Sequence, residues 1–557
     1  MTQTEIEKLV KKQRDFFNSG ETLNVSFRIS ALEKLRACII KYEKKINQAI
    51  RADLGKSAFE SYMCETGLVL SELTYMIKHT RKFAKERTVH TPLAQFQSRS
   101  YQKPSPYGVV LIMSPWNYPL MLTLEPLIDA LAAGNTAIVK PSAYSANTSE
   151  LISRMLGECF DEKYVAVVTG GREENTCLLN EHFDYIFFTG SQSVGKEVMR
   201  CASAHLTPIT LELGGKSPCI VHKSADIKLA AKRIVFGKFL NCGQTCVAPD
   251  YIYCDSTVKD ELLNELKKQI QKQYGRQPLK RKQYGKIINE KHFDRLLGLI
   301  DYKKVVVGGM ANRSTLQIEP TIMDNVTFSD LVMHEEIFGP ILPVLTYDFI
   351  DEAVDTIRSM SHPLALYIFT QDKCAAKSVI EKIGFGGGCI NDTLIHLATS
   401  EMPFGGFGES GLGSYHYHCG DHEAHLHPNG VCPYKNGAVS NENTSGQTQT
   451  QTQTQTQSAG NQNQVTEQMN TYQPVFDANY YYMNNPDLQS VVGSDSQKLF
   501  EHFYTCGMAE GRRASENFDV SVYKANNPDL VAVFGDDLKA YYTHYVQSGQ
   551  LENRVCK

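Results

Sequence analysis

Short apolar runs rich in β-branched residues recur along the first 415 residues and alternate with segments of helical periodicity. A sheet with one face in water would instead show a polar residue at every second position. Uninterrupted apolar strands therefore need cover on both faces. The pattern predicts an α/β fold built on a parallel sheet with helices on both sides. We expect strands at 107–114, 135–139, 164–168 and 185–188, and a helix over 124–133.

Composition and charge exclude several classes of protein. Hydrophobic residues make up 42% of the 557 positions and charged residues 21%, as in ordinary globular domains. The formal net charge of −4 gives no general attraction to nucleic acid or to an anionic membrane surface. No window reaches about 18 uninterrupted apolar residues, so we expect no membrane span.

The cysteines indicate the compartment. The N-terminal segment MTQTEIEKLVKKQRDFF lacks the apolar core and the small-residue cleavage site of a secretion signal. Fifteen cysteines in a chain without such a signal are typical of a reducing compartment, where most are buried thiols. We therefore expect a cytoplasmic protein.

The chain changes character after residue 415. Residues 416–435 are crowded with His and Cys, and 436–472 are polar with the run QTQTQTQTQTQ at 447–457. A segment of this composition cannot bury enough apolar surface to offset its ordering entropy. We expect 436–472 to be a disordered linker.

An internal repeat follows the predicted linker. Phe476-Asp477 recurs as Phe518-Asp519, and NNPDL recurs at 484–488 and 526–530. His502 and Gly507 recur as His544 and Gly549, with the same offset of 42 residues. Agreement at this many landmarks predicts two 42-residue helical units over 473–557.

Cys242 and Cys246 stand four residues apart in the stretch FGKFLNCGQTCVAPDY (236–251). A zinc site with four ligands is poorly supported, because no second close pair lies nearby. The reducing compartment disfavours a disulfide. Two interpretations remain from the residues alone: a pair of buried thiols, or one bystander and one nucleophile.

Several other motifs accompany this pair. They are SPWNYP (114–119), VKPS (139–142), FFTGSQSVG (187–195), LELGGKSPCIV (211–221), HEEIFGP (334–340) and MPFGGFGESGLGSYH (402–416). In this order and at these separations, the chain from about residue 5 to 416 resembles the aldehyde dehydrogenase superfamily. The similarity is strongest to the class 3, fatty-aldehyde-type branch. The resemblance implies oxidation of medium- or long-chain aliphatic or aromatic aldehydes to carboxylic acids with NAD or NADP.

The resemblance assigns three catalytic residues. Cys246, in the family's Gly-Gln-x-Cys position, corresponds to the nucleophile that forms the thiohemiacetal and thioester, and Cys242 is then a bystander. Asn117 corresponds to an oxyanion donor, together with the backbone N–H of Cys246. Glu212 corresponds to the general base that activates water. Its neighbours Leu211 and Leu213 predict a partly apolar setting, which would raise the pKa of the carboxyl group.

The resemblance also implies the coenzyme contacts. A lysine just past a parallel strand is well placed for a ribose, and a glycine-containing loop at a helix start suits a phosphate. The family often has a glutamate three residues after this lysine. Here Ala143 stands there, which leaves NADP possible. The expected coenzyme-binding residues are Lys140, Gly190, Ser191, Gly195, Glu336 and Phe338.

The expected organisation follows from the same resemblance. Residues 1–210 should form a Rossmann-like NAD(P)-binding domain with an oligomerisation hairpin at 95–108. Residues 211–395 should form the catalytic domain, and 396–415 should return to the coenzyme domain.

The resemblance ends near residue 416. The family chain should continue with a late strand that supports the homodimer, and that strand is missing here, which puts the homodimer in doubt. Residues 415–434 (YHYHCGDHEAHLHPNGVCPY) instead resemble a YHYH-type Cys/His module of bacterial secreted or envelope proteins, and the tail repeats resemble surface-protein modules. Either a natural fusion or a chimeric join of two sequences would explain a dehydrogenase-like head followed by modules that resemble exported proteins. The absent export signal favours the chimeric join. The alternative function is a surface-binding protein with an inactive head.

The His- and Cys-rich segment has ligands for zinc but matches no standard zinc-finger spacing. A loop with a Cys419–Cys432 disulfide is an equal alternative in an oxidising setting. We therefore predict no metal site.

Overall fold

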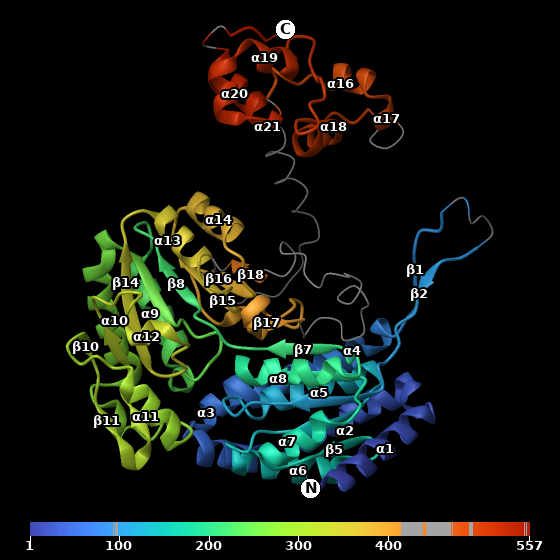
Figure 1. Cartoon of the computed structure of the whole chain (residues 1–557), viewed down its shortest axis with the longest axis vertical. Helices are drawn as coiled ribbons and strands as arrows, with labels where there is room; N and C mark the ends of the chain where they lie inside the picture. Colours follow the sequence, from blue (N-terminus) through green and yellow to red (C-terminus); the bar gives the residue numbers. More distant parts are fainter. Residues whose placement is uncertain are drawn as a thin grey trace, which may run out of the picture. The chain divides into compact units, whose positions relative to one another are not determined.

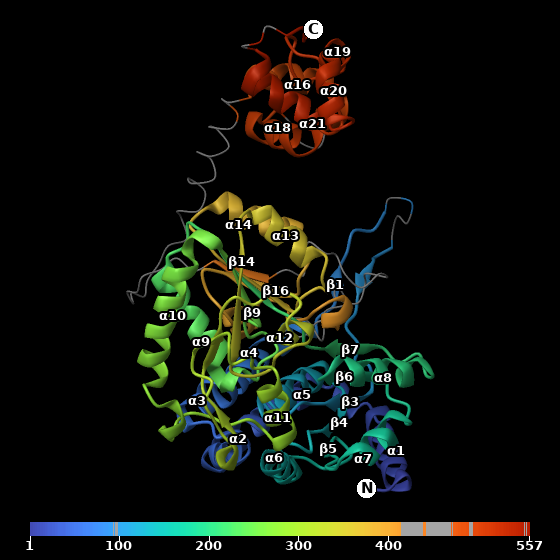
Figure 2. The same cartoon turned by 60° about the vertical axis from the view of Figure 1, so that its left-hand side comes forward.

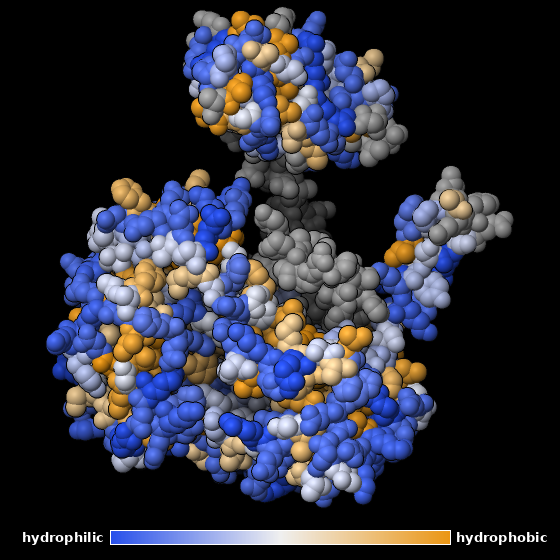
Figure 3. All heavy atoms as spheres, viewed as in Figure 1, coloured by the Kyte–Doolittle hydropathy of each residue, from blue (hydrophilic) through white to orange (hydrophobic). Residues whose placement is uncertain are grey.

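The computed structural model describes residues 1–92, 94, 98–413, 438–441, 469, 472–489, 494–550, 552 and 554–556 (Figure 1). These residues belong to two compact units, Met1–Asn443 and Thr444–Lys557. The His- and Cys-rich segment 416–435 lies outside the described residues. In Figure 3 hydrophilic residues cover most of the visible face of the first unit, with scattered hydrophobic ones between them.

A six-stranded sheet forms the first half of unit one, with strand order β17-β7-β6-β3-β4-β5. All its neighbours pair in parallel except β17, which is antiparallel to β7. All four strands expected from the apolar runs are present here, so the predicted parallel sheet is confirmed. The strands are β3 (Val109–Met113), β4 (Thr136–Lys140), β5 (Val165–Val167), β6 (Tyr185–Thr189), β7 (Ile209–Glu212) and β17 (Gly411–Leu412).

Helices cover both faces of this sheet because its strands are apolar on both sides. Along β3, Val109 and Leu111 face one core, and Val110 and Ile112 face the other. One face carries α1 (Gln3–Asn18), α7 (Arg172–Leu179) and α8 (Gln192–Ser203). The other carries α2 (Val25–Leu54), α4 (Gly67–Phe83), α5 (Met121–Ala133) and α6 (Ala146–Cys159). The helix predicted over 124–133 is α5.

An eight-stranded sheet forms the second half, with order β10-β13-β14-β9-β8-β15-β16-β18. It is parallel apart from β10, which is antiparallel to β13. Its strands are β8 (Pro218–Val221), β9 (Tyr251–Asp255), β10 (Val305–Val307), β13 (Thr321–Met323), β14 (Ile341–Tyr347), β15 (Ala365–Phe369), β16 (Gly387–Ile390) and β18 (Ala438–Asn441).

The second sheet is also covered on both faces. Helices α9 (Ile227–Phe239) and α10 (Lys259–Tyr274) pack on the side whose core is continuous with that of the first sheet. The opposite side carries α11 (Glu290–Gly298), α12 (Leu331–His334), α13 (Ile350–Arg358) and α14 (Lys373–Lys382). A small antiparallel pair, β11 (Ala311–Asn312) and β12 (Gln317–Ile318), completes this half.

Strand β18 lies within 436–472, the segment for which we predict a disordered linker. Its residues 438–441 pair in parallel with β16 at the edge of the second sheet, and most of the rest of the segment lies outside the described residues. Backbone N–H and C=O groups at an open sheet edge accept a further strand of almost any sequence. Polar composition therefore did not exclude pairing at this point.

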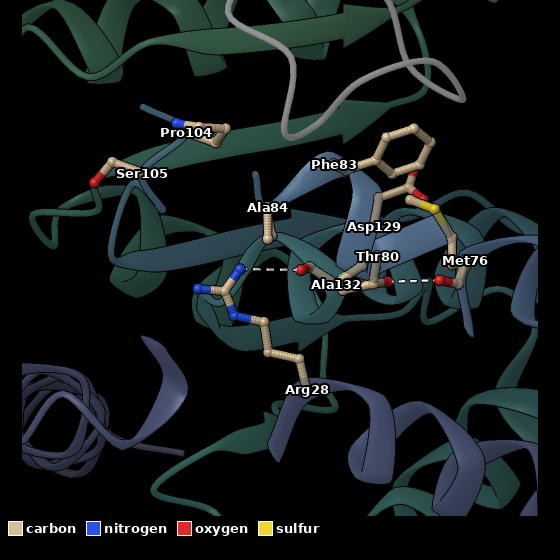
Figure 4. A pocket seen from close by; sticks show the side chains of 10 residues that line it. Arg28, Met76, Thr80, Phe83, Ala84, Pro104, Ser105, Asp129 and Ala132 are labelled. Carbon is tan, nitrogen blue, oxygen red and sulfur yellow. Dashed lines mark hydrogen bonds between the residues drawn. The ribbon is translucent and has the colours of Figure 1, made fainter. Parts of the chain in front are cut away.

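A two-stranded arm stands away from the body of unit one in both views (Figures 1 and 2). Its strands are β1 (Arg87–Thr88) and β2 (Tyr101–Gln102), so the pairing begins before the hairpin expected at 95–108. A small hollow of about 20 Å³ lies at the root of the arm, lined by Pro104 and Ser105 (Figure 4). Arg28 reaches into it and donates to the Ala132 carbonyl. A space of this size holds about one water molecule and no larger ligand.

Unit two has its own core of aromatic and aliphatic side chains. Equivalent contacts recur in its two halves: Tyr481 bonds His502 at 3.0 Å, and Tyr523 bonds His544 at 2.9 Å. The first half contains α16 (Ala478–Asn484), α17 (Pro486–Gln489) and α18 (Ser496–His502). The second contains α19 (Val520–Asn526), α20 (Pro528–Phe534) and α21 (Leu538–His544).

Candidate active site

Two hollows of unit one meet at the same residues. One is an apolar cavity of about 250 Å³, and the other is a larger, more polar cleft of about 810 Å³. Cys246 and Glu212 line both, as do Thr189, Leu122 and Leu213. A group that enters from the cavity and a group that enters from the cleft would therefore meet beside this thiol and this carboxyl.

The loop that carries Cys246 makes a tight turn after α9. Asn241, Cys242 and Gly243 all have left-handed backbone conformations, with φ of 51°, 53° and 73°. Three such residues in succession reverse the chain within one turn, at a conformational cost for the two that are not glycine. Gln244 then fastens the loop from inside: its amide donates to the Asn241 and Lys286 carbonyls and accepts from the Ile288 N–H.

The Asn117 loop is fixed against the Cys246 loop. Asn117 Nδ2 donates to the Gln244 carbonyl at 3.0 Å, and Asn241 Nδ2 donates to the Asn117 carbonyl at 2.8 Å. Tyr118 and Thr245 share a hydroxyl–hydroxyl hydrogen bond of 2.6 Å. Asn117, which follows β3, is 2% exposed and lines the cleft. The structure thus brings together Asn117, Glu212 and Cys246, which lie far apart in the sequence.

The two cysteines of the opening motif have different surroundings. Cys242 packs into the core of the second sheet, and burial raises the pKa of its thiol well above the ordinary value. Cys246 is half-buried and borders both hollows. Cys246 is therefore placed to react with a ligand, whereas Cys242 is a packed core thiol.

The environment of Cys246 holds its thiol in the protonated form. Burial raises its pKa, and the nearby carboxyl groups of Glu336 and Glu212 raise it further. The backbone N–H groups of Cys246 and Val247 act in the opposite direction by hydrogen bonding to the sulfur. A nucleophilic thiolate therefore requires either a base or a positive charge that arrives with a ligand.

Glu212 ends strand β7 with its side chain buried. Neither carboxyl oxygen has a hydrogen-bond partner among the described residues. Burial raises its pKa well above the usual range, which confirms the apolar setting predicted from Leu211 and Leu213. A buried, unpartnered carboxyl in a cleft is suited to take up a proton from a small molecule.

Four of the expected coenzyme-binding residues line the cleft: Gly190, Ser191, Glu336 and Phe338. Burial, followed by the charge of Asp250, raises the pKa of Glu336 to about 8. Its Oε1 atom is buried and lacks a partner among the described residues. A Cβ added to Gly214 would lie 1.9 Å from Glu336 Oε2, so a side chain there would displace this carboxyl group.

These features fit a dinucleotide. The Oε1 atom of Glu336 is available to accept hydrogen bonds from ribose hydroxyls. The Phe338 ring lies edge-on to the Trp116 ring, with 5.3 Å between their centroids, so two aromatic side chains meet at the cleft. The volume of the cleft and its polar lining also suit a ligand larger than the aldehyde.

Lys140 and Gly195 lie outside the set of residues that line the cleft. The Lys140 ammonium donates to the carbonyls of Pro141 and Gly170, and burial lowers its pKa to about 8. Gly195 lies within α8, where an added Cβ would approach Leu213 to 2.8 Å. Gly195 is buried within α8 and packs against Leu213, the residue that follows β7.

Sequence reasoning missed several residues of the site. Gln244 stands within the cysteine motif without a role that the sequence predicts, yet it contacts both the Asn117 loop and the Cys246 loop. The apolar lining had no signal in the sequence, because its members come from distant segments. They include Met63, Leu68, Tyr118, Met121, Phe236, Leu240, Leu394, Ile395, Leu397 and Phe404.

Comparison with known proteins identifies the family. The model of the "Aldehyde dehydrogenase family" matches residues 1–424. The chain belongs to the aldehyde dehydrogenase family. A relative from Staphylococcus aureus, named 4,4'-diaponeurosporen-aldehyde dehydrogenase, is 48% identical over 74% of this chain and 90% of its own length. The dog "Aldehyde dehydrogenase, dimeric NADP-preferring" is 43% identical over 74% of this chain and 91% of its own length.

Solved structures agree with this assignment. The "Substrate bound state of Staphylococcus Aureus AldH" superposes with a TM-score of 0.73 at 47% identity, over 74% of this chain and 90% of the other. An NAD+ complex of an aldehyde dehydrogenase from Bacillus cereus gives a TM-score of 0.68 at 28% identity, over 74% of this chain and 85% of the other. Unit one is thus an aldehyde dehydrogenase that oxidises aldehydes with NAD or NADP.

Among the residues the structure describes, no group of three or more His, Cys, Asp or Glu could hold a metal ion. In the same parts of the chain, every helix is too short or too polar to cross a lipid bilayer.

Proposed function

We propose that Cys246 is the nucleophile of this aldehyde oxidation and Asn117 its oxyanion donor. The observation that carries the proposal is the position of Cys246 where the apolar cavity opens into the polar cleft. The Cys246 thiol first loses its proton to solvent. The thiolate sulfur then attacks the aldehyde carbonyl, a C–S bond forms, and the carbonyl π pair moves to oxygen. The Asn117 amide retains one N–H beyond the one given to Gln244, and it would donate to this oxyanion. One such donor typically lowers the barrier by about 3 kcal/mol.

Glu212 acts as the general base in the second half of the reaction. Loss of hydride converts the thiohemiacetal into a thioester on Cys246. Glu212 then takes a proton from water, and the hydroxide attacks the acyl carbon. The C–S bond breaks, the acid leaves, and the proton returns to sulfur. The unpartnered, buried carboxyl supports this role, because both of its oxygens are available to accept a proton and burial raises its pKa above that of an ordinary carboxyl group.

The coenzyme would be held in the cleft by Glu336, Phe338, Gly190 and Ser191, which all line it. When bound, the nicotinamide supplies a positively charged ring and accepts the hydride. Lys140 stays a proposed adenosine-ribose contact, and Gly195 a proposed phosphate-loop residue. Ala143 in place of an acidic residue supports use of NADP beside NAD.

The apolar cavity selects the substrate. The surface that its lining residues expose is almost entirely apolar, so desolvation favours an aldehyde with an extended apolar group. We therefore propose medium- to long-chain aliphatic or aromatic aldehydes.

The setting of the enzyme is proposed on two further grounds. The thirteen cysteines that the structure describes are free thiols, which suits the cytoplasm. The dog relative is named dimeric, and we propose a homodimer through unit one, testable by light scattering.

Single substitutions test the catalytic roles. With decanal and NAD, Cys246→Ser should abolish NADH formation at 340 nm, whereas Cys242→Ala should retain most of the activity. Glu212→Gln should still form the acyl-enzyme but release it at least about 100-fold more slowly. Equal turnover of wild type and Cys246→Ser would refute the assignment of the nucleophile.

A further inference from the structure

A fully buried ion pair lies behind the Asn117 loop. Lys56 Nζ and Glu65 Oε1 are 2.7 Å apart, and both side chains are 0% exposed. Neither residue lines the cleft or the apolar cavity. The pair therefore does not touch a ligand and acts, if at all, through the residues it contacts.

Local backbone geometry brings the two partners together. Lys56 follows Gly55, the left-handed residue that ends α2. Glu65 lies in the π-helical segment η2 (Tyr62–Thr66), between α3 (Ala58–Ser61) and α4. π-Helical turns are rare, and they occur often at functional sites. The wider turn sets the direction in which Glu65 leaves the helix.

The ion pair holds the Asn117 loop at both ends. Lys56 Nζ donates to the Asn117 carbonyl at 3.0 Å, and Glu65 Oε2 accepts from the Leu120 N–H at 2.8 Å. Leu120 is the N-cap residue of α5, where a negative charge is favourable. The charged side chains of Lys56 and Glu65 thus fix both ends of the segment 117–120, which carries the proposed oxyanion donor.

The same lysine also reaches the nucleophile loop. Its ammonium lies 4.0 Å from the centre of the Tyr118 ring, in a cation–π contact. The Tyr118 hydroxyl bonds Thr245, the residue before Cys246. Lys56 is therefore connected to the donor and, through one aromatic ring, to the thiol loop.

Stability alone is a weak reason for this arrangement. Replacing a buried ion pair by apolar residues is often neutral or stabilising, because two charges must be desolvated. A role in geometry is the better explanation. We infer that Lys56 and Glu65 are positioning residues that aim the Asn117 amide at the carbonyl oxygen of the substrate. This inference rests on the proposed oxyanion role of Asn117.

The test compares two reactions of Cys246. Hydrolysis of 4-nitrophenyl acetate passes through an oxyanion, whereas alkylation by iodoacetamide forms a C–S bond with loss of iodide and passes through none. Lys56→Met and Glu65→Gln should lower kcat for ester hydrolysis and for decanal oxidation about 10- to 100-fold. KM should change less than about threefold. The rate of Cys246 alkylation, followed by peptide mass spectrometry, should stay within about twofold.

A matched control comes from the same end of α2. Asp53 is also buried, and it caps α6 by accepting from the backbone and side chains of Asn147 and Thr148. Asp53→Asn should lower Tm without lowering kcat. Lys56→Arg, which keeps the charge, should recover part of the activity lost in Lys56→Met.

The outcomes separate the inference from the function on which it rests. If Asn117→Ala loses ester hydrolysis while folded Lys56→Met and Glu65→Gln keep it, the positioning role is wrong. If Asn117→Ala keeps it as well, the oxyanion role itself fails. Equal loss of ester hydrolysis and alkylation would show a collapsed loop and would also overturn the inference. Should Lys56→Met not fold, the isosteric Glu65→Gln decides the matter.

Discussion

The thiol of Cys246 faces two carboxyl groups, Glu212 and Glu336, and burial raises the pKa of all three. The two carboxyl groups also raise the cost of ionising the thiol, because like charges repel in a medium of low dielectric. A ligand that brings positive charge or hydrogen-bond donors would lower the cost of ionising the thiol. The site is thus arranged so that the reactive thiolate forms in the presence of ligands.

Coenzyme affinity should depend on pH through Glu336. Its pKa of about 8 means that the acceptor form predominates above pH 8 and becomes scarce below it. If ribose hydroxyls bind the carboxylate, the apparent Kd for NAD should rise up to about tenfold for each pH unit below 8 and level off above it. Trp116, the single tryptophan of the chain, lines the cleft, so its fluorescence quenching reports binding.

The control for this titration is Glu336→Gln. This variant should bind NAD more weakly than wild type at pH 9, with a Kd that is nearly constant from pH 6.5 to 9. The same pH slope in wild type and variant would show that another group titrates.

At the scale of elements, the loop that carries Cys246 and the loop that carries Glu336 and Phe338 are in such close backbone contact that no side chain fits between them. Gly243, between α9 and β9, has φ of 73°, and an added Cβ would lie 2.2 Å from the Gly339 carbonyl oxygen. Gly339 directly follows Phe338 in the loop that also carries Glu336. The loop of the nucleophile and the loop of the coenzyme contacts therefore set each other's position.

Gly243→Ala should disturb both loops at once. We expect loss of most aldehyde oxidation, weaker NAD binding and a Tm lower by several degrees, because a left-handed residue and a backbone clash both oppose the added methyl group. Gly157→Ala is the matched control: Gly157 lies within α6, and nothing lies within 4 Å of its added Cβ. That change should stabilise by roughly 0.5–1 kcal/mol and leave activity intact. Normal activity in Gly243→Ala would contradict the close contact.

At the scale of the whole molecule, each of the two units has its own core. The core of unit two draws its members from residues 475–542, whereas the three cores of unit one end at Phe404. The family match also ends at residue 424. The residues that line the apolar cavity and the cleft all belong to unit one.

Separation of the units should therefore preserve both folds. A chain that ends at Asn443 should oxidise decanal with a kcat within about twofold of the full chain. Residues 469–557 alone should show helical circular dichroism and one cooperative thermal transition, since their aromatic core is self-contained. Inactivity of the shortened chain at an unchanged Tm would show that the tail contributes to catalysis.

Much of this protein could be predicted from the sequence. The uninterrupted apolar runs determined a parallel sheet with two covered faces, because a strand without polar positions cannot face water. The family resemblance carried by the motif around Cys246, the segments with Glu212 and Asn117 and the other motifs implied the reaction. The strand signal is local, since it resides in a few consecutive residues, whereas the resemblance depends on the order and separation of several motifs along the chain.

Other features depended on contacts between distant residues, and only the tertiary structure decided them. The pairing of Lys56 with Glu65 behind Asn117, the lining of the apolar cavity and the pairing of β18 with β16 all bring together segments that local patterns treat as independent. Such contacts depend on backbone direction and packing, which no short stretch of sequence encodes. The sequence alone thus determined the layers and the chemistry, and the folded chain decided which side chains surround the thiol and hold its partners in place.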